Sequence, residues 1–323
     1  MATADPALLD ARLRAAETTL AAHYGRTLTE RMVRTPNGLD VRVVEFPAAP
    51  GSDPALPPIL LLHGIASVTA VAMPLVGTLA GRRILAVDWP GHGLSGRSVL
   101  GRDAELRTHV VSVLDAVLTA YSLERVDLIG HSLGGQFALY FTLARPERVR
   151  RLVLLGAPGA GFGEVQPVLA MRALAVPGLG GAILGLSTSQ AAYAKNSDGL
   201  LGKGALDGFP AEIVEIGYLA SQRPDFAPSV SSMFRALITP FAVRPHVPVS
   251  HEALATLSTP VLMVWGDDDV FLNPVKGRAS FDAIPGAQLL EVHGGHAPWL
   301  NEPQRVADAV STFLDSDQAA ATG

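Results

Sequence analysis

A serine, an aspartate and a histidine stand in this order along the chain, each at the end of an apolar run. Ser132 lies in GHSLGG (130–135), Asp269 ends WGDDD (265–269), and His296 ends HGGH (293–296). A serine hydroxyl is a weak nucleophile at neutral pH, so it needs a general base, and the base needs an acid to orient it. The three residue types therefore predict nucleophilic catalysis.

The surroundings of Ser132 match this chemistry. The string GHSLGG follows the apolar run RVDLIG and opens the apolar stretch LGGQFALYFTLA. A serine on a sharp strand-to-helix turn has its hydroxyl pushed out of the sheet edge, and the flanking glycines are needed because side chains there would collide with backbone. The start of the helix also favours developing negative charge. An ordinary helix N-cap is the alternative, but the later Asp and His motifs favour catalysis.

The elements that must hold these residues have a clear rhythm. From residue 59, short apolar runs such as PILLLHG and VRRLVLLGAPG are each followed by a Gly-rich turn and a helical stretch, and the rhythm resumes at TPVLMVWGDDD. Such runs are typical of strands buried on both faces. We expect right-handed βαβ units and a mostly parallel central sheet flanked by helices, built from residues 31–158 and 251–315.

Both ends of the chain are predicted separately. Asp5 followed by Pro6 reads as a helix N-cap and first turn, and an amphipathic helix within residues 1–30 follows. Asn37-Gly38 between two β-rich runs predicts a hairpin that opens the sheet. We expect residues 316–323 to form a flexible tail.

Residues 159–250 break the rhythm and are unusually apolar. Arg172 is the sole charged residue between Glu164 and Lys195. A membrane-spanning helix needs about 20 predominantly apolar residues, but Arg172, two prolines and a Gly-rich break fit one poorly. We expect a mainly helical cap that lines a substrate pocket, and no stable membrane insertion.

In these motifs the chain resembles the α/β-hydrolase superfamily over roughly residues 30–315. The resemblance rests on HG (63–64), DWPGHGLS (88–95), the GHSLGG string, WGDDD and GGHAPWLNEP (294–303). It implies the α/β-hydrolase fold with a cap insertion. It also implies a triad of Ser132, Asp269 and His296, and an oxyanion hole formed by the backbone N–H groups of Ile65 and Leu133.

Neighbouring residues leave alternatives open. Asp267 and Asp268 precede Asp269 directly, and only the W-G-x-x-D pattern of the family selects Asp269 as the acid, with Asp268 as the alternative. Three further side chains are tentative pocket residues, although such residues more often tie loops or form core: His63, His131 and Trp299.

Composition excludes several classes of protein. Of 323 residues, 48% are hydrophobic and 17% are charged, and the net charge of −5 comes without a Lys/Arg block, so no nucleic-acid partner is expected. The chain has no cysteine, which excludes disulfides, thiolate metal sites and a cysteine nucleophile. Acidic residues at the start argue against a signal peptide, so we expect the cytoplasm.

No cofactor or metal is expected either. A dinucleotide loop starting at Gly159 would need glycine where Glu164 stands. His293 and His296 are three residues apart and lack the partner glutamate of a zinc motif.

The sequence then narrows the reaction. Serine at the turn argues against haloalkane dehalogenases and epoxide hydrolases, which are known for aspartate there, and Ala297 stands where carbon–carbon hydrolases usually place Trp. We expect a hydrolase of a carboxylic ester, lactone or thioester, acting through an acyl-enzyme on a small apolar substrate, as a monomer or homodimer. Medium-length or bulky esters should be preferred, with the apolar group on either the acyl or the alcohol side. The alternatives are an acyltransferase with the same triad, a carbon–carbon bond hydrolase, or a non-catalytic ligand receptor.

Overall fold

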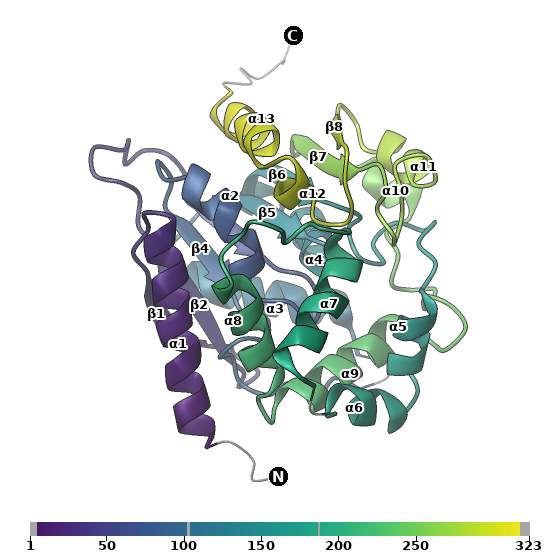
Figure 1. Cartoon of the computed structure of the whole chain (residues 1–323). Coiled ribbons are helices and arrows are strands. Elements are labelled where there is room, and N and C mark those ends of the chain that lie inside the picture. The colour runs from purple at the N-terminus through teal and green to yellow at the C-terminus, as the bar shows by residue number, and fades with distance from the viewer. Residues whose placement is uncertain (1–4, 102–103, 187, 317–323) are drawn as a thin grey trace.

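The computed structural model describes residues 5–101, 104–186 and 188–316 and shows a central sheet with helices on both faces (Figure 1). The strand order is β1-β2-β4-β3-β5-β6-β7-β8; β1, β2 and β4 pair antiparallel and all later pairs are parallel. The predicted mostly parallel sheet is confirmed. The strands are β1 (Thr29–Arg34), β2 (Asp40–Phe46), β3 (Ile59–Leu62), β4 (Ile84–Val87), β5 (Val126–His131), β6 (Val149–Leu155), β7 (Val261–Gly266) and β8 (Gln288–Val292).

The central strands are apolar throughout because both of their faces are covered. In β3, Leu60 and Leu62 belong to the hydrophobic cluster on one face, and Ile59 and Leu61 belong to the cluster on the other. The first cluster includes side chains of α3 (Leu106–Ala120), α4 (Leu133–Ala144), α10 (His251–Leu254) and α11 (Arg278–Asp282). The second includes side chains of α1 (Pro6–His23), η1 (Thr69–Ala72), α2 (Met73–Thr78), α12 (Pro298–Asn301) and α13 (Pro303–Asp315). A short turn, η2 (Pro146–Arg148), precedes β6.

The N-terminal helix forms as predicted. The Asp5 carboxylate accepts a hydrogen bond from the Ala7 N–H, and Pro6 is the first helical residue. The periodic residues Leu9, Leu13 and Leu20 are buried. The helix therefore lies along the sheet rather than in solvent.

The predicted hairpin is also present. β1 and β2 pair antiparallel from Thr29–Glu45 to Arg34–Asp40, and Gly38 in the turn has a φ of 82°. The sheet begins at Thr29, two residues earlier than the apolar pattern alone indicated, because Thr29 still has a partner in β2.

Between β6 and α10 the described residues of 159–250 form helices rather than strands, apart from an isolated bridge between Ile238 and Val243. α8 packs on α1 and η1, whereas α5 and α6 pack on α9 and α7 packs on α8. The helices are α5 (Leu169–Leu174), α6 (Leu179–Leu184), α7 (Gln190–Leu201), α8 (Glu212–Ser221) and α9 (Phe226–Leu237). We refer to them together as the cap.

In the described part of the chain, no helix is both long and apolar enough to cross a membrane. The predicted tail lies, apart from Ser316, outside the described residues.

Candidate active site

Ser132 occupies a strained turn between β5 and α4. Its φ is 53°, a value that side-chain-bearing residues seldom adopt. A Cβ on Gly130 would lie 2.5 Å from the Gly134 carbonyl oxygen, and one on Gly134 would lie 2.2 Å from the Leu62 carbonyl oxygen. Glycine is thus required on both sides of Ser132, as the sequence pattern predicted.

The predicted oxyanion donors lie next to this turn. A Cβ on Gly64 would be 3.1 Å from the Ser132 Cβ, so the backbone that leads into Ile65 passes close to the serine. Leu133 is the first residue of α4, where a backbone N–H has no partner within the helix. Ile65, Ser132 and Leu133 all line one small pocket. Their arrangement suits stabilisation of negative charge beside Ser132.

Asp269 and His296 form a buried pair at the ends of β7 and β8. The Asp269 Oδ2 lies 2.8 Å from the His296 Nδ1 and also accepts from the Ala157 N–H at 2.9 Å, while Oδ1 accepts from the Phe271 N–H at 3.0 Å. Burial raises the pKa of Asp269, but His296 and the two N–H donors outweigh it, so that pKa lies below its ordinary value. Asp269 is therefore an anion that orients the His296 ring.

The two other aspartates of the string point elsewhere. Asp267 and Asp268 are exposed, and Asp267 contacts His293 and accepts from the Gly294 N–H. Of the three, Asp269 contacts His296 in this structure.

The other ring nitrogen of His296 faces a cavity. His296 Nε2 is buried and makes no hydrogen bond to any described residue, Ser132 included. Ser132 and His296 both line a cavity of about 750 Å³ between the sheet and the cap. Catalytic hydrogen bonds are often long in unliganded enzymes and shorten when substrate binds. The arrangement leaves Nε2 open to accept a proton at the cavity wall.

Two buried histidines hold the turn at residues 64–66. The Trp89 N–H donates to His63 Nε2, so the neutral ring carries its proton on Nδ1, which donates to the Gly64 carbonyl at 2.8 Å. His92 Nε2 accepts from the Ala66 N–H at 3.0 Å. Burial lowers the pKa of both rings, that of His92 to about 3, so both stay neutral. They fix the peptide planes on each side of Ile65.

The tentative pocket residues separate into two groups. His131 lines the large cavity, and its Nε2 lies 3.1 Å from the His296 carbonyl oxygen. Neither His63 nor Trp299 is among the described residues that line it. Both side chains are turned toward backbone instead: His63 toward Gly64, and Trp299 through an indole hydrogen bond to the Val71 carbonyl. The expectation that His63 and Trp299 form the pocket wall is therefore wrong. Both side chains support nearby backbone instead.

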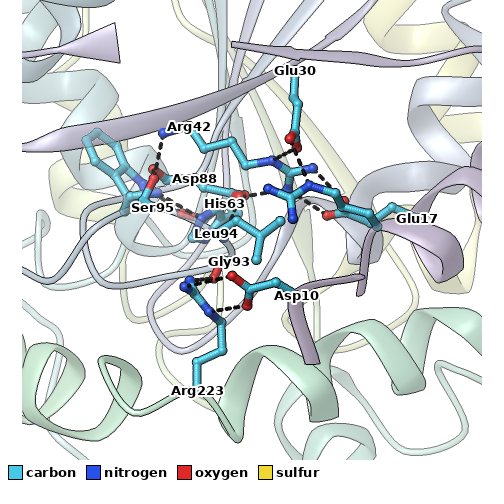
Figure 2. Close-up of polar contacts among 12 residues, drawn as sticks. Asp10, Glu17, Glu30, Arg42, His63, Asp88, Gly93, Leu94, Ser95 and Arg223 are labelled. Carbon is cyan, nitrogen blue, oxygen red and sulfur yellow. Dashed lines mark hydrogen bonds and ion pairs between the residues drawn. The ribbon is translucent and has the colours of Figure 1, made fainter. Parts of the chain in front are cut away.

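A buried charge cluster lies next to the 88–95 loop, which carries His92 (Figure 2). The fully buried Arg42 guanidinium on β2 contacts Glu17 from α1, Glu30 from β1 and Asp88 after β4. The Asp88 carboxylate also accepts from the Leu94 N–H, which holds the 88–95 loop that carries His92. Arg42 carries no direct functional signal in the sequence beyond its place within a largely apolar strand. We call these four residues the Arg42 cluster.

The cap supplies most of the large cavity's wall. Its lining includes side chains of all five cap helices, and Lys195 is the only Lys, Arg, Asp or Glu among the described lining residues. Phe271, which sequence reasoning missed, also lines the cavity and places its ring 4.4 Å from that of His296. A hollow of about 580 Å³ between β1 and α3 contains none of the candidate residues. Among the described residues, no group of three or more His, Asp or Glu side chains is placed to hold a metal ion.

Known proteins share this architecture. A carboxylesterase from Bacillus subtilis superposes with a TM-score of 0.73 at 21% identity, covering 95% of this chain and 98% of its own. At this identity the likeness shows the fold alone.

Relatives by sequence are hydrolases of more than one kind. A 2-hydroxymuconate semialdehyde hydrolase from Pseudomonas sp. (strain CF600) is 32% identical over 275 residues, 82% of this chain and 89% of the relative. An sn-1-specific diacylglycerol lipase from Mus musculus is 27% identical over 274 residues, 81% of this chain and 82% of the relative. The model of the alpha/beta hydrolase family matches residues 59–309. The chain therefore belongs to the alpha/beta hydrolase family.

Proposed function

We propose that the protein is a serine hydrolase that cleaves a carboxylic ester, or a lactone or thioester, of an apolar substrate through an acyl-enzyme. The observation that carries this proposal is the convergence of Ser132 and His296 on one cavity, with Asp269 behind the histidine. This convergence supports Ser132 as nucleophile, His296 as base and Asp269 as orienting acid, the three roles that acyl transfer requires.

The proposed reaction has two steps. Ser132 Oγ bonds to the carbonyl carbon while His296 Nε2 takes its proton, and the oxyanion is held by the N–H groups of Ile65 and Leu133. The bond to the leaving oxygen or sulfur then breaks, and His296 returns the proton to that atom. Water then bonds to the acyl carbon as His296 takes its proton, the bond from that carbon to Ser132 Oγ breaks, and His296 returns the proton to Oγ as the acid leaves. One oxyanion donor contributes about 2.7 to 4 kcal/mol.

The lining of the cavity supports an apolar substrate. Ligand sites of this kind hold about 300–1,000 Å³ and fix their ligand mainly through apolar contacts. Here the described lining is largely aliphatic and aromatic, and its one cationic side chain, Lys195, is exposed.

The test is chemical labelling joined to turnover. A fluorophosphonate probe should label the protein once, and Ser132→Ala should abolish both labelling and hydrolysis of 1-naphthyl acetate, with a loss on the order of 10⁶ in kcat. Thr142→Ala, on the same helix and away from both cavities, serves as the control. Full turnover by Ser132→Ala would end the proposal. If the parent protein binds esters but does not cleave them, the result would favour the alternative of a non-catalytic ligand receptor.

Carbon–carbon bond hydrolysis is the second candidate, because the 32% identical relative is named for a semialdehyde hydrolase. A dienoate substrate carries a carboxylate, for which Lys195 is the available cation in the described lining. Comparing kcat/KM for 1-naphthyl acetate with that for 2-hydroxy-6-oxohepta-2,4-dienoate decides between them, and we expect the ester to be faster. Adding an alcohol acceptor and analysing products would reveal acyl transfer if a new ester forms.

A further inference from the structure

Two cavities of very different size meet at Ser132. The larger holds about 750 Å³ and the smaller about 50 Å³. Ser132 and Ile65 line both of them. A carbonyl carbon bonded to Ser132 Oγ would therefore have space for a substituent on each side.

The remaining lining shows which part of the substrate each cavity takes. His296 lines only the large cavity, and Leu133 lines only the small one. The leaving atom receives its proton from His296, so the leaving group must lie on the histidine side. The oxyanion points to the N–H groups of Ile65 and Leu133. The remaining substituent, the acyl chain, is then directed into the small pocket.

The sizes set the lengths of the two parts. A cavity needs about 10–15 Å³ to admit one water molecule, so the 50 Å³ of the small pocket admits a chain of about three to five heavy atoms beyond the carbonyl. The large cavity lies within the range of complete small-molecule sites, about 300–1,000 Å³. The acyl part must be short and the leaving part can be bulky.

The small pocket also selects by polarity. Besides Ser132, its described lining carries one polar side chain, that of Gln136, which is fully buried. The Gln136 Oε1 accepts from the Ala160 N–H at 3.0 Å, and its Nε2 donates to the Tyr140 hydroxyl at 2.8 Å. Both ends of the amide thus have protein partners. A charged or hydroxylated acyl group would lose its hydration there without compensation.

The far wall of the small pocket is firmly built. It includes Leu237 and Ile238 at the end of α9, both nearly fully buried, and Val243, which pairs with Ile238 in a short bridge. The Tyr140 hydroxyl that holds Gln136 donates in turn to the Val247 carbonyl. A longer acyl chain must push these packed groups apart, which native cores resist.

We infer that the enzyme acts on substrates with an apolar acyl group no longer than about hexanoyl, joined to a bulky apolar leaving group. This inference rests on the proposed function, because it takes Ser132 as the nucleophile and His296 as the proton donor. It applies to an ester or to a carbon–carbon bond alike, since either reaction leaves the acyl group on Ser132. It places the bulk, which the sequence left on either side, on the leaving group.

Two ester series test the assignment. In the first, acyl chains from acetyl to dodecanoyl are joined to 1-naphthol; in the second, alcohols from methanol to 1-naphthol carry a fixed acetyl group. We expect kcat/KM to fall about tenfold for each methylene beyond hexanoyl and to rise with alcohol size. Dodecanoyl esters that react as fast as hexanoyl esters of 1-naphthol would overturn the inference.

Matched variants locate the effect. Val243→Ala widens only the small pocket and should move the chain length at which kcat/KM begins to fall beyond hexanoyl, leaving the ranking of alcohols as in the parent. Leu174→Ala, which lines only the large cavity, should change the ranking of alcohols and not that of acyl chains. Val243 is half-buried, so its variant is less prone to misfold than Leu237→Ala, which provides a second enlargement. A shift in the alcohol ranking with Val243→Ala would contradict the assignment.

The fluorophosphonate label separates the two proposals. If Ser132 is labelled and esters are cleaved but long acyl chains are preferred, the pocket assignment is wrong and the proposed function stands. If Ser132 is neither labelled nor needed for turnover, both are wrong.

Discussion

The loops under Ser132 and the outer cap helices are held in different ways. The loops at 63–66 and 88–95 are fixed by buried polar side chains, including His63, His92 and Asp88. In α5, α6 and α7, by contrast, the buried residues are Gly180 and Leu201. Proton transfer needs atoms that are held at fixed distances. An apolar pocket wall needs only to offer apolar surface, because hydrophobic contacts are not directional. Segments with few buried contacts open at lower free energy. We therefore expect α5, α6 and α7 to change conformation more readily than the loops at 63–66 and 88–95.

After Ser132→Ala, the largest effect should come from the acid behind the base. Asp269→Asn keeps the shape of the side chain but cannot hold the imidazolium that forms at His296, so kcat should fall about 10⁴-fold. The matched variant Asp268→Asn, at an exposed neighbour without contact to His296, should stay within a few-fold of the parent in the same ester assay. Equal losses in the two variants would refute the assignment of Asp269.

The next effect is on stability and arises in the Arg42 cluster. Arg42→Met leaves the buried Asp88 and Glu17 carboxylates without their cation, and such a loss costs about 3–5 kcal/mol. Arg12→Met removes an exposed ion pair with Glu215 and should cost less than about 1 kcal/mol. Urea denaturation of both variants measures the difference. A small loss for Arg42→Met would mean that the cluster does not hold the loops.

A smaller effect is the dependence of the free energy of unfolding on pH, which arises from His92. Because the pKa of His92 is about 3 when folded and near 6.5 when unfolded, the unfolded chain binds more protons between these values. The contribution of His92 to stability is complete above pH 6.5 and is lost as pH falls toward 3, at about 1.4 kcal/mol per pH unit.

His92→Gln can still accept from the Ala66 N–H but does not titrate. We measure the free energy of unfolding of both proteins at pH 7 and at pH 5. On going to pH 5 it should fall less in the variant than in the parent, by about 1.4 kcal/mol for each pH unit below 6.5. The same decline in both proteins would show that His92 is not held neutral.

The smallest effect should be seen in the cap. Leu186→Ser replaces a leucine that is 65% exposed, and the unfolding free energy should change by about 0.5 kcal/mol or less. Amide hydrogen exchange should be faster in α5, α6 and α7 than in β5. Strong protection of α5 equal to that of β5 would remove the contrast between loops and cap.

Local sequence was sufficient for much of the fold and for where the candidate residues stand. The strand-turn-helix pattern around Ser132 lies within a dozen residues, so the position of Ser132 at that turn could be predicted from sequence. Continuous apolar runs likewise predicted strands buried on both faces, which are typical of a parallel sheet. The structure then brings Asp269 to His296, the aspartate that the W-G-x-x-D pattern of the family implied. Their catalytic roles stay proposals.

Other features depend on residues that meet only in three dimensions. The Arg42 cluster joins Glu17, Glu30 and Asp88 from three elements, and no spacing in the sequence links them. The size of the small pocket depends on how the end of α9 packs against Gln136. His63 is a tentative pocket residue by sequence, yet its ring is turned to backbone.

The contact between α1 and α8 has a consequence for the order of folding. Arg223, just after α8, bonds to the Gly93 carbonyl and pairs with Asp10 of α1, 213 positions earlier in the chain (Figure 2). During synthesis, α1 leaves the ribosome well before this partner, which follows 213 residues later. Contacts so distant in sequence form late because loop closure must precede them. Helix α1 therefore gains its contacts with α8 and Arg223 later than those with the earlier strands, and the part of its surface that faces α8 stays uncovered until α8 emerges.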